Sequence, residues 1–466
     1  MTQQVSASRT SPWRRGIESA RTVRVELSAT AKRHGLTAFF IMQIIAMTFL
    51  QKFAMQLHVQ LGGFYLSVGS VQLVMPVFYA GLVLLFITAK PKVDLVRLAL
   101  FTAFVATIIV SLALQTNPYS PSSVMLAVAC YLPFILKIDV DATTYRKMLK
   151  IFLNFMLFFG VVVLIQQAVQ IIWSWRLWPN LDELVSPDFL LPGFNYIQAI
   201  KYGSRLMKPN SVFFLEVSTV SQFIALAVIV EVMYFQRLWR LAFYTFVLLA
   251  TFAGTGPLLI LMCAPVVLWK LNLRSILLVL AVFSIGYVAA DRIQWYQQVQ
   301  GRLTEYKSQG SSANKRFIEP LEAMAVTIQK PEYILSGIGP GNTAKNDGTV
   351  AWAISKVAVE YGLLCTVAFF GLVGYSLFGG APSKRLAFAL LIFFNFMGGG
   401  IIIPVYPMLI FLFGGLFRVK AEKGSSRKGT SHTPPTGLEW LRRSLGLGGK
   451  RSKGSRGERT RTRATS

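Results

Sequence analysis

The stretch from Lys150 to Trp173 reads KIFLNFMLFFGVVVLIQQAVQIIW and carries its single charge at its first residue. A helix rises about 1.5 Å per residue, so roughly 20 mostly apolar residues are needed to cross the hydrocarbon core of a bilayer. The stretch meets that requirement, and we predict that it forms a membrane-spanning helix.

The composition of the whole chain extends this prediction. Of the 466 residues, 54% are hydrophobic and only 14% are charged, and the mean hydropathy is +0.52. Soluble proteins carry about a quarter of their residues as charged groups and could not bury so much apolar surface. We therefore predict an all-α, polytopic membrane helix bundle with about twelve transmembrane helices. The predicted spans lie at about residues 36–53, 64–88, 97–114, 122–138, 150–173, 212–235, 239–253, 257–270, 275–290, 350–378, 386–400 and 401–417.

The distribution of charge predicts the orientation of the bundle. Residues 1–35 hold seven basic and two acidic residues, and residues 418–466 hold fourteen basic and three acidic ones, out of a net charge of +27. Basic segments stay on the cytoplasmic side of a membrane, which predicts that both termini are cytoplasmic and that 36–417 is the transmembrane domain. Every second loop is then cytoplasmic and basic, and the cations concerned are Lys90, Lys92, Arg97, Arg146, Lys147, Lys150, Arg237, Arg240, Lys270, Arg274, Lys384 and Arg385. One broken helix over 239–270, around Gly254 and Pro257, is the alternative, and it would reverse everything downstream.

Two large loops, about 174–211 and 291–349, are predicted to be extracytoplasmic and contain many cations. Cations kept there against the topological bias suggest a functional role, although long loops also translocate regardless of charge. The tail at 418–466 is too polar to bury a core and is predicted to be disordered. Its basic residues favour anionic lipid of the cytoplasmic leaflet as a partner, and nucleic acid is the weaker alternative.

Several chemistries are not supported by the sequence. The histidines His34, His58 and His432 are far apart, and the three cysteines lie in separate apolar runs, so no metal site is predicted. No Gly-Lys-Ser/Thr phosphate loop is present, so ATP-driven transport is not supported and no cofactor is predicted.

Four motifs occur in order between residues 205 and 364. They are RLMKPNSVFFLE at 205–216, TFAGTG at 251–256, the loop residues RFIEPLEA at 316–323 with SGIGPGN at 336–342, and ISKVAVEYGLL at 354–364. This order resembles the bacterial O-antigen ligase and polymerase superfamily, which includes the Wzy-type polysaccharide polymerases. The resemblance covers roughly residues 200–375.

The resemblance implies a glycosyltransferase in the bacterial cytoplasmic (inner) membrane. It would transfer glycans from a polyprenyl diphosphate carrier at the outer face of that membrane. Two departures from the family pattern matter. Gly254 and Thr255 stand where an Arg is usual, so no role is carried over to that turn. The ligase branch carries a His shortly before the Glu-x-Gly helix, whereas no histidine lies between His58 and His432 here, which favours a polymerase over a ligase.

The residue types fit this chemistry. A diphosphate leaving group needs its negative charge stabilised, and Arg meets phosphate oxygens with two parallel hydrogen bonds. Arg316 and Arg205 are therefore the first catalytic candidates, with Lys201, Lys208 and Asn210 assigned to substrate binding. The alternative for each cation is a solvated loop residue.

A carboxylate is also expected, because a sugar hydroxyl must lose its proton during the transfer. Glu216 and Glu319 are the candidates on the loop side, and Glu360 lies in an apolar helix, where ionisable groups are costly. A structural ion pair with Lys356, one helical turn earlier, is the alternative for Glu360. Gly337, Gly339 and Gly341 are predicted to shape a turn, with Asn342 beside them and Gly339, Gly341 and Asn342 at the substrate.

Together these patterns predict polymerisation of lipid-linked oligosaccharide repeat units outside the cytoplasmic membrane. Flippase and chain-length regulator proteins are candidate partners. A ligase is the nearest alternative, and a flippase or secondary transporter for the same lipid is the alternative from another class. Transporters concentrate ionisable residues near the bilayer midplane, whereas here they gather in two loops, which favours an enzyme.

Overall fold

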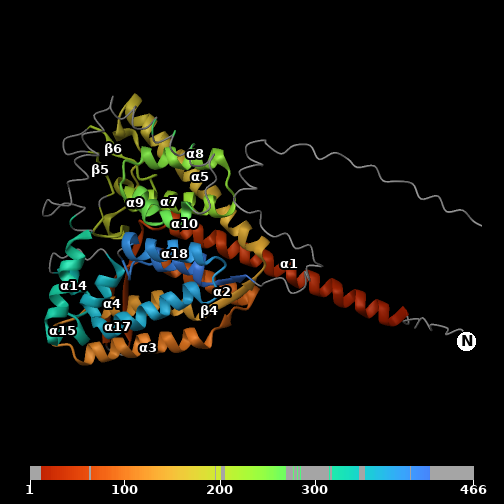
Figure 1. Cartoon of the computed structure of the whole chain (residues 1–466), viewed down its shortest axis with the longest axis horizontal. Helices are drawn as coiled ribbons and strands as arrows, with labels where there is room; N and C mark the ends of the chain where they lie inside the picture. The colour runs from red at the N-terminus through yellow and green to blue at the C-terminus, as the bar shows by residue number, and fades with distance from the viewer. Residues whose placement is uncertain are drawn as a thin grey trace, which may run out of the picture. The chain divides into compact units, whose positions relative to one another are not determined.

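The computed structural model describes residues 12–61, 64–194, 196–200, 205–268, 277, 281, 284, 314, 317–345, 352–398 and 400–419. The predicted span at 275–290, most of the second large loop and the basic tail beyond residue 419 therefore lie outside the described residues. Within the described part the chain is mostly helical, as predicted (Figure 1).

The helices of the bundle follow one another closely along the chain. Those of the first half are α1 (Pro12–Phe49), α2 (Val74–Ala89), α3 (Leu95–Ala113), α4 (Pro121–Tyr131) with the short η1 (Leu132–Ile135), α5 (Ala142–Ile172), η2 (Trp175–Leu177), α6 (Leu181–Leu184) and η3 (Pro187–Phe189). Those of the second half are α7 (Val217–Tyr234), α8 (Leu238–Ala250), α9 (Thr255–Met262), α10 (Ala264–Leu268), α14 (Glu319–Gln329), α15 (Pro331–Ser336), α16 (Asn342–Lys345), α17 (Ala353–Phe378), α18 (Lys384–Ile392), η5 (Phe393–Gly398), α19 (Val405–Ile410) and η6 (Phe411–Gly415).

Four of the described helices are long and apolar enough to cross a membrane. They are α3, α5, α7 and α17, and the apolar stretch at 150–173 forms most of α5. The predicted spans at 239–253 and 257–270 begin as separate helices, α8 and α9. Helix α8 ends at Ala250, and the positive φ of 53° at Phe252 prevents it from continuing. The structure thus supports a membrane protein, and the count of twelve spans stays a prediction.

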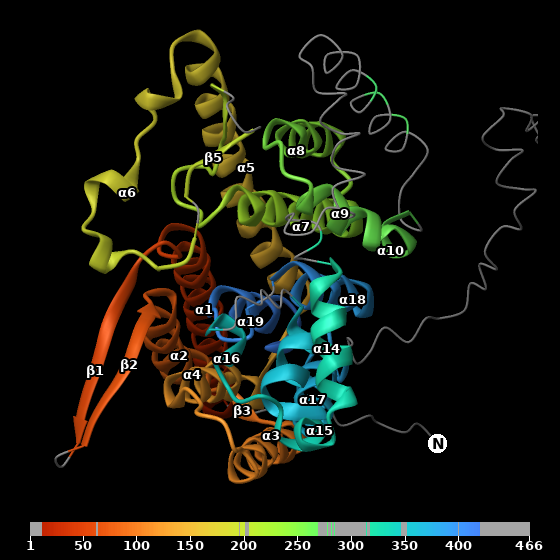
Figure 2. The same cartoon turned by 90° about the vertical axis from the view of Figure 1, so that its left-hand side faces the viewer.

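The prediction of helix from residue 64 was wrong at its start. The residues before α2 form an antiparallel hairpin of β1 (Ala54–Leu61) and β2 (Phe64–Gln72), drawn in orange at the left of Figure 2. The sequence of β1, AMQLHVQL, alternates apolar and polar residues from Met55 to Leu61, and that period of two favours a strand. Short strands also occur as β3 (Lys92–Val93), β4 (Leu136–Val140), β5 (Gln198–Ala199), β6 (Met207–Lys208) and β7 (Phe417–Val419). Strand β4 pairs with β3 and β7, and β5 pairs with β6.

Local capping explains where several helices start. Asp94 accepts hydrogen bonds from the backbone N–H groups of Val96 and Arg97 at the start of α3, and Asp141 does the same for Thr144 in α5. These carboxylates satisfy N–H groups that have no partner inside the helix. Helix α4 combines a Ser120 cap with Pro121 at its first position.

One end of the bundle, which we call the Asp94 end, is closed by a buried arginine. Arg97 of α3 donates hydrogen bonds to the carbonyl oxygens of Leu136 (2.9 Å), Gly415 (2.6 Å) and Ser376 (3.0 Å). Carbonyls at the ends of helices lack partners within the helix, and the guanidinium supplies them. Arg97, predicted to belong to a basic cytoplasmic loop, is instead 1% exposed and joins three segments.

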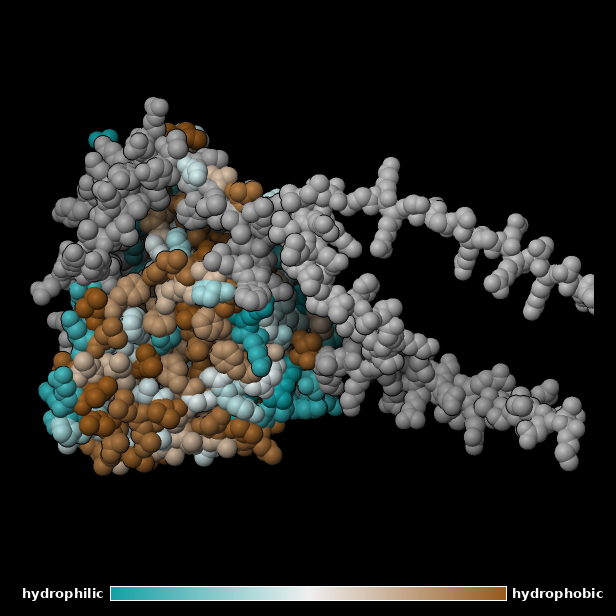
Figure 3. Space-filling model, in the orientation of Figure 1, coloured by the Kyte–Doolittle hydropathy of each residue, from teal (hydrophilic) through white to brown (hydrophobic). Residues whose placement is uncertain are grey.

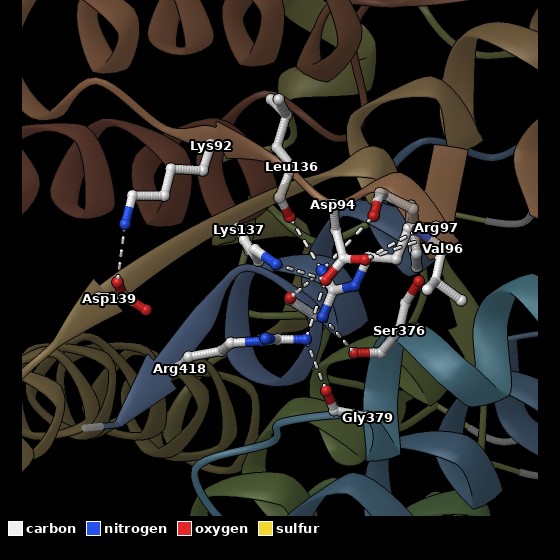
Figure 4. A network of polar contacts seen from close by, with 12 residues as sticks. Lys92, Asp94, Val96, Arg97, Leu136, Lys137, Asp139, Ser376, Gly379 and Arg418 are labelled. Carbon is white, nitrogen blue, oxygen red and sulfur yellow. Dashed lines mark hydrogen bonds and ion pairs between the residues drawn. The ribbon is translucent and has the colours of Figure 1, made fainter. Parts of the chain in front are cut away.

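The charges around Arg97 complete this closure (Figure 4). Asp94 pairs with Lys137 at 2.8 Å and with Arg418 at 2.9 Å, so three segments distant in sequence meet at one carboxylate. Burial acts to raise the pKa of Asp94. The hydrogen bonds from Lys137 and from the Arg97 backbone, with the charges of Lys137 and Arg418, outweigh burial and lower it.

The opposite end, which we call the Lys52 end, gathers the other helix termini. Gln51, just after α1, accepts a hydrogen bond from the backbone N–H of Leu215 before α7, at 3.3 Å. Ser111 near the end of α3 donates to the carbonyl of Ser336 at 2.8 Å. In Figure 1 this end lies at the left, where α14, α15, β5 and β6 are drawn. The two large loops of the sequence analysis, as far as they are described, belong to this end.

The surface between the two ends is apolar. Figure 3 shows hydrophobic side chains over much of the face in view. The most exposed of them on the helices include Ile87, Leu95, Ile109, Ile165, Ile171 and Val367, each at least 55% exposed. A monomeric soluble protein rarely leaves so large an apolar surface open to water, whereas lipid covers it without cost.

Candidate functional site

The predicted site residues fall into three groups. Arg316 and Lys201 lie outside the described residues. Arg205 is exposed, Lys208 is half-buried in β6, and Glu319 is the half-buried first residue of α14. The others, which form two clusters at the Lys52 end, are Asn210, Glu216, Gly339, Gly341, Asn342 and Glu360.

A strained turn leads from the first loop into α7. Ser211 and Val212 have φ values of 56° and 65°. Residues other than glycine rarely adopt a positive φ, and β-branched residues such as valine do so least often. The side chain of Asn210 accepts a hydrogen bond from the backbone N–H of Val212 at 3.0 Å and donates to the carbonyl of Tyr196 at 2.8 Å. Asn210 therefore acts within the protein as a turn former. Strain of this kind persists where the surroundings over-determine the backbone, and it concentrates at functional sites.

Two glutamines near the end of α5 hold this turn and the residues before it in place, and a third bonds to α8. Gln170 donates to the carbonyl of Met207 at 3.0 Å and accepts from the backbone N–H of Met207 at 2.9 Å, as a strand neighbour would. Gln166 accepts from the backbone N–H of Ser211 at 2.8 Å. Gln167 donates to the carbonyl of Ala250, at the end of α8. The segment that carries Lys208, Asn210 and Glu216 is thus fixed to α5 by side chains that the sequence analysis did not select.

Glu216 is the N-cap residue of α7 and is half-buried. Its carboxylate accepts a hydrogen bond from the hydroxyl of Ser218 at 3.1 Å. Glu216 also acts electrostatically on Tyr196. Burial raises the pKa of Tyr196 to about 12, and the negative charges of Asp182 and Glu216 add to the effect. The carboxylate therefore lies in a cluster that includes the first loop.

A buried lysine lies in the same cluster and was missed by the sequence analysis. Lys52 follows the end of α1 and is 1% exposed. Its ammonium lies 3.1 Å from an oxygen of Asp182 and 4.9 Å from the ring centroid of Tyr196. The signal that could have found it is its position, because a cation directly after an apolar run is unusual on the side that basic residues avoid.

The second cluster forms where the glycine-rich turn contacts α17. The backbone N–H groups of Ile338 and Gly339 donate to the carbonyls of Val359 (2.7 Å) and Glu360 (3.2 Å). Those carbonyls lie in α17 just before Gly362, whose φ of 84° and ψ of 172° break the helix. The turn therefore bonds to backbone groups beside the break, and the two motifs, predicted separately, form one structural unit.

Glycine is required in this turn for two reasons. Gly337, Gly339 and Gly341 all have positive φ, as predicted for a turn. A Cβ at Gly341 would lie 2.7 Å from Ser120, at the start of α4. The Asn342 side chain donates to the carbonyls of Pro118 and Ile338, each at 2.7 Å. Gly339, Gly341 and Asn342 thus shape and anchor the turn.

Glu360 is 1% exposed, and its hydrogen-bond partner is not the Lys356 that helical spacing suggested. One carboxylate oxygen accepts a hydrogen bond from the hydroxyl of Thr343, and the other is buried without a hydrogen-bond partner. The expected ion pair with Lys356 is not formed among the described residues. The break at Gly362 brings the turn residues against Glu360, and Thr343 becomes its neighbour.

The TFAGTG motif connects α8 to α9 along the chain and packs the start of α9 against α7. Thr255 donates to the carbonyl of Ser218 at 3.2 Å, and the backbone N–H of Gly256 donates to the hydroxyl of Ser221 at 3.1 Å. A Cβ at Gly256 would lie 2.5 Å from the carbonyl oxygen of Ser221, so only glycine allows this approach. The motif therefore packs directly against the helix that begins after Glu216.

Residues of η5 link α7 to the start of α17. Gln222 of α7 donates to the carbonyl of Met397 at 3.2 Å, and Asn395 accepts from the backbone N–H of Ile354 at 3.0 Å. The segment 393–398 thus bridges α7 and the start of α17. Of the described parts of the four motifs, each lies at the Lys52 end.

Among the described residues no group of three or more His, Cys, Asp or Glu side chains could hold a metal ion. Cys130, Cys263 and Cys365 are buried free thiols. Comparison with protein-family models, curated proteins and solved structures gives no significant match.

Proposed function

We propose that the chain is a membrane glycosyltransferase that polymerises oligosaccharide repeat units carried on polyprenyl diphosphate. The hydroxyl of the acceptor sugar attacks C1 of the donor sugar, the bond from C1 to the diphosphate oxygen breaks, and the lipid diphosphate leaves. The hydroxyl proton passes to a carboxylate of the protein. The reaction takes place at the Lys52 end, which we assign to the outer face of the bacterial cytoplasmic membrane.

The observation that carries this proposal is the convergence of the motifs. The segment 205–216, the turn at 254–256, the turn at 337–342 and the helix around Glu360 are spread over more than a third of the chain. Their described residues nevertheless lie at one end of the bundle. The turn at 254–256 contacts α7 beside Glu216, the turn at 337–342 contacts α17 beside Glu360, and the segment 393–398 links α7 to the start of α17. Residues that act on one substrate need such proximity.

The two carboxylates have different surroundings, which suggests different roles. Glu216 is half-buried beside the first loop, so substrate can reach it, and we assign proton acceptance to it. Glu360 is enclosed by the glycine-rich turn and is 1% exposed, so we assign it to holding the turn. Arg316 and Arg205 remain the candidates for stabilising the diphosphate charge, on the sequence pattern.

The lipid-linked glycan profile of cells that lack the protein tests the function. Accumulation of single lipid-linked repeat units would support a polymerase. Accumulation of full-length polymer on its lipid carrier would instead identify a ligase. Complementation with Glu216→Gln at equal protein abundance should leave the single repeats in place if Glu216 accepts the proton.

One observation favours a second candidate, a flippase or secondary transporter. Helix α17 is broken at Gly362 next to the buried Glu360, and discontinuous helices with buried ionisable residues are typical of transporters. The same glycan profile separates the two functions. A transporter predicts repeat units that stay on the cytoplasmic face of the membrane, where a non-permeant glycosidase added outside spheroplasts cannot reach them.

A further inference from the structure

The side chain of Lys52 is buried with an incomplete counter-ion. Its ammonium pairs with one oxygen of Asp182 at 3.1 Å. The other Asp182 oxygen is buried and has no hydrogen-bond partner. A buried ion pair is stable when the remaining lone pairs and protons are also satisfied, and here one carboxylate oxygen is not. The pair therefore contributes little to the stability of the fold. An anion that offers Lys52 more hydrogen-bond acceptors would compete with Asp182.

The segment that carries Asp182 covers Lys52 from the side of the first loop. Helix α6 has four residues. Among the described contacts, Asp182 is its one side chain that bonds to a residue outside the loop, whereas Glu183 bonds to Asn180 within it. The backbone adds two contacts, from Leu191 N–H to the Lys52 carbonyl at 2.8 Å and a bridge between Phe53 and Leu190. On either side of this segment, the indole N–H of Trp178 donates to the carbonyl of Gln166 in α5, and Asn210 donates to the carbonyl of Tyr196.

Large apolar side chains are exposed on this covering segment, alongside the exposed charged residues Glu183 and Asp188. Leu177, Leu184 and Phe189 are 63%, 76% and 59% exposed, and Trp173 at the end of α5 is 68% exposed. Aromatic and apolar residues at the end of a spanning helix are typical of the interface between lipid and water. The ligand that would reach Lys52 from this side is therefore one carried by a lipid.

We propose that Lys52 binds the diphosphate of a polyprenyl carrier and that Asp182 is a resident counter-ion which the diphosphate displaces. The identity of the carrier rests on the proposed function. The site itself requires only a lipid-borne diphosphate. Tyr196, whose ring lies 4.9 Å from the Lys52 ammonium, would remain beside the bound phosphates.

Direct binding to the full-length protein in nanodiscs tests this site. The probe is fluorescently labelled geranylgeranyl diphosphate, with labelled geranylgeraniol as the form that lacks phosphate. We expect Lys52→Gln to weaken diphosphate binding on the order of tenfold or more, and Lys52→Arg to keep most of it. Asp182→Asn should strengthen binding several-fold, because it removes the competing anion. Arg176→Gln, which changes an exposed cation of the same loop, should bind as the wild type does.

The proposal predicts weaker diphosphate binding for Lys52→Gln and stronger binding for Asp182→Asn. These opposite effects distinguish a binding site from a purely structural ion pair. If the pair only holds the loop, Lys52→Gln and Asp182→Asn weaken binding together, and that result overturns the proposal. Should either single variant fail to fold, the double variant Lys52→Gln/Asp182→Asn removes both charges and leaves no unpaired ion. The proposal requires the double variant to lose diphosphate binding, and wild-type binding by it would overturn the proposal.

The source of the phosphate is decided by competition. Unlabelled geranylgeranyl diphosphate should displace the probe, whereas phosphatidylglycerol in the nanodisc and free inorganic diphosphate should not. Displacement by either of the last two would overturn the assignment to a lipid diphosphate. Because binding is measured without polymer formation, loss of the proposed polymerase function would leave the Lys52 result unaffected.

Discussion

Gly337 lies so close to α17 that a Cβ on it would be 2.6 Å from the carbonyl oxygen of Glu360. Its φ of 66° and ψ of −169° belong to a region that only glycine occupies freely. The contact joins the second large loop to the helix that carries a candidate site residue, so the turn and the break in α17 depend on each other.

Gly337→Ala should therefore disrupt the unit of turn and helix. We expect a loss of about 2 kcal/mol or more in stability, from backbone strain and from the clash with α17. Thermal unfolding in detergent, followed by fluorescence-detected size exclusion, measures it. Gly374→Ala is the matched control, because a Cβ there meets nothing within 4 Å and alanine favours a helix. Equal stability of the two variants would contradict the close packing described.

Gln170→Leu should lower polymer formation without unfolding the protein. The substitution leaves the N–H and C=O of Met207 without their side-chain partner, which frees the segment that carries Lys208 and Glu216. A displacement that costs about 1.4 kcal/mol in the transition state reduces the rate tenfold. Initial rates on purified lipid-linked repeats, at equal folded protein, measure the loss. Gln329→Leu, at an exposed position of α14, should behave as the wild type.

Substitutions of Arg316 test the sequence-based assignment of the diphosphate ligand. Arg316→Lys keeps the charge but loses the paired hydrogen bonds, which should cost on the order of 1.5–3 kcal/mol, or a rate loss of about 10- to 150-fold. Arg316→Ala should be slower still. Arg302→Ala, a loop cation outside the motifs, serves as the control. Normal polymer yield from Arg316→Ala would remove this residue from the site and leave Arg205 as the main candidate.

The Asp94 end should show a pH-dependent stability. The pKa of Asp94 is lower in the folded protein than its ordinary value of 3.8, so its ion pairs stabilise the fold above that pH and are lost as the pH falls through the folded-state pKa. Asp94→Asn should cost about 2 kcal/mol at pH 7, and the difference from the wild type should shrink below about pH 4. Melting temperatures between pH 3 and pH 7 measure both. The exposed Asp188→Asn is the control, and a difference that stayed constant down to pH 3 would exclude this role.

The predicted orientation can be read with topology reporters. A reporter that is active only outside the cytoplasm should work when it is fused near Gly193 or Ser311 and fail near Lys147, Leu271 or Ser425. Gly193 belongs to the Lys52 end and Lys147 to the Asp94 end, so these two fusions test the sidedness of the described bundle. Activity at Ser425 would overturn the count of twelve spans.

The sequence alone determined the class of protein and the positions of most helices. A long apolar run such as 150–173 needs no tertiary partner to be recognised, because lipid and backbone hydrogen bonding impose the same helix on it wherever it packs. The caps at Asp94 and Asp141 act within three residues and are equally local. The second strand of the hairpin at 54–72 was predicted as the start of a helix because it adjoins the apolar run of α2. The average hydropathy of such a stretch does not distinguish a strand from a helix.

The tertiary structure decided which side chains meet. Lys52 and Asp182 are 130 positions apart, and Arg97 reaches the carbonyl of Gly415 across 318 positions. No local pattern encodes such pairs, since each depends on how the helices between them pack. Glu360 shows the consequence most directly. Helical periodicity pointed to Lys356 as its partner, but the break at Gly362 and the turn at 337–342 gave it Thr343 instead, because backbone contacts between distant segments outweigh the spacing along one helix.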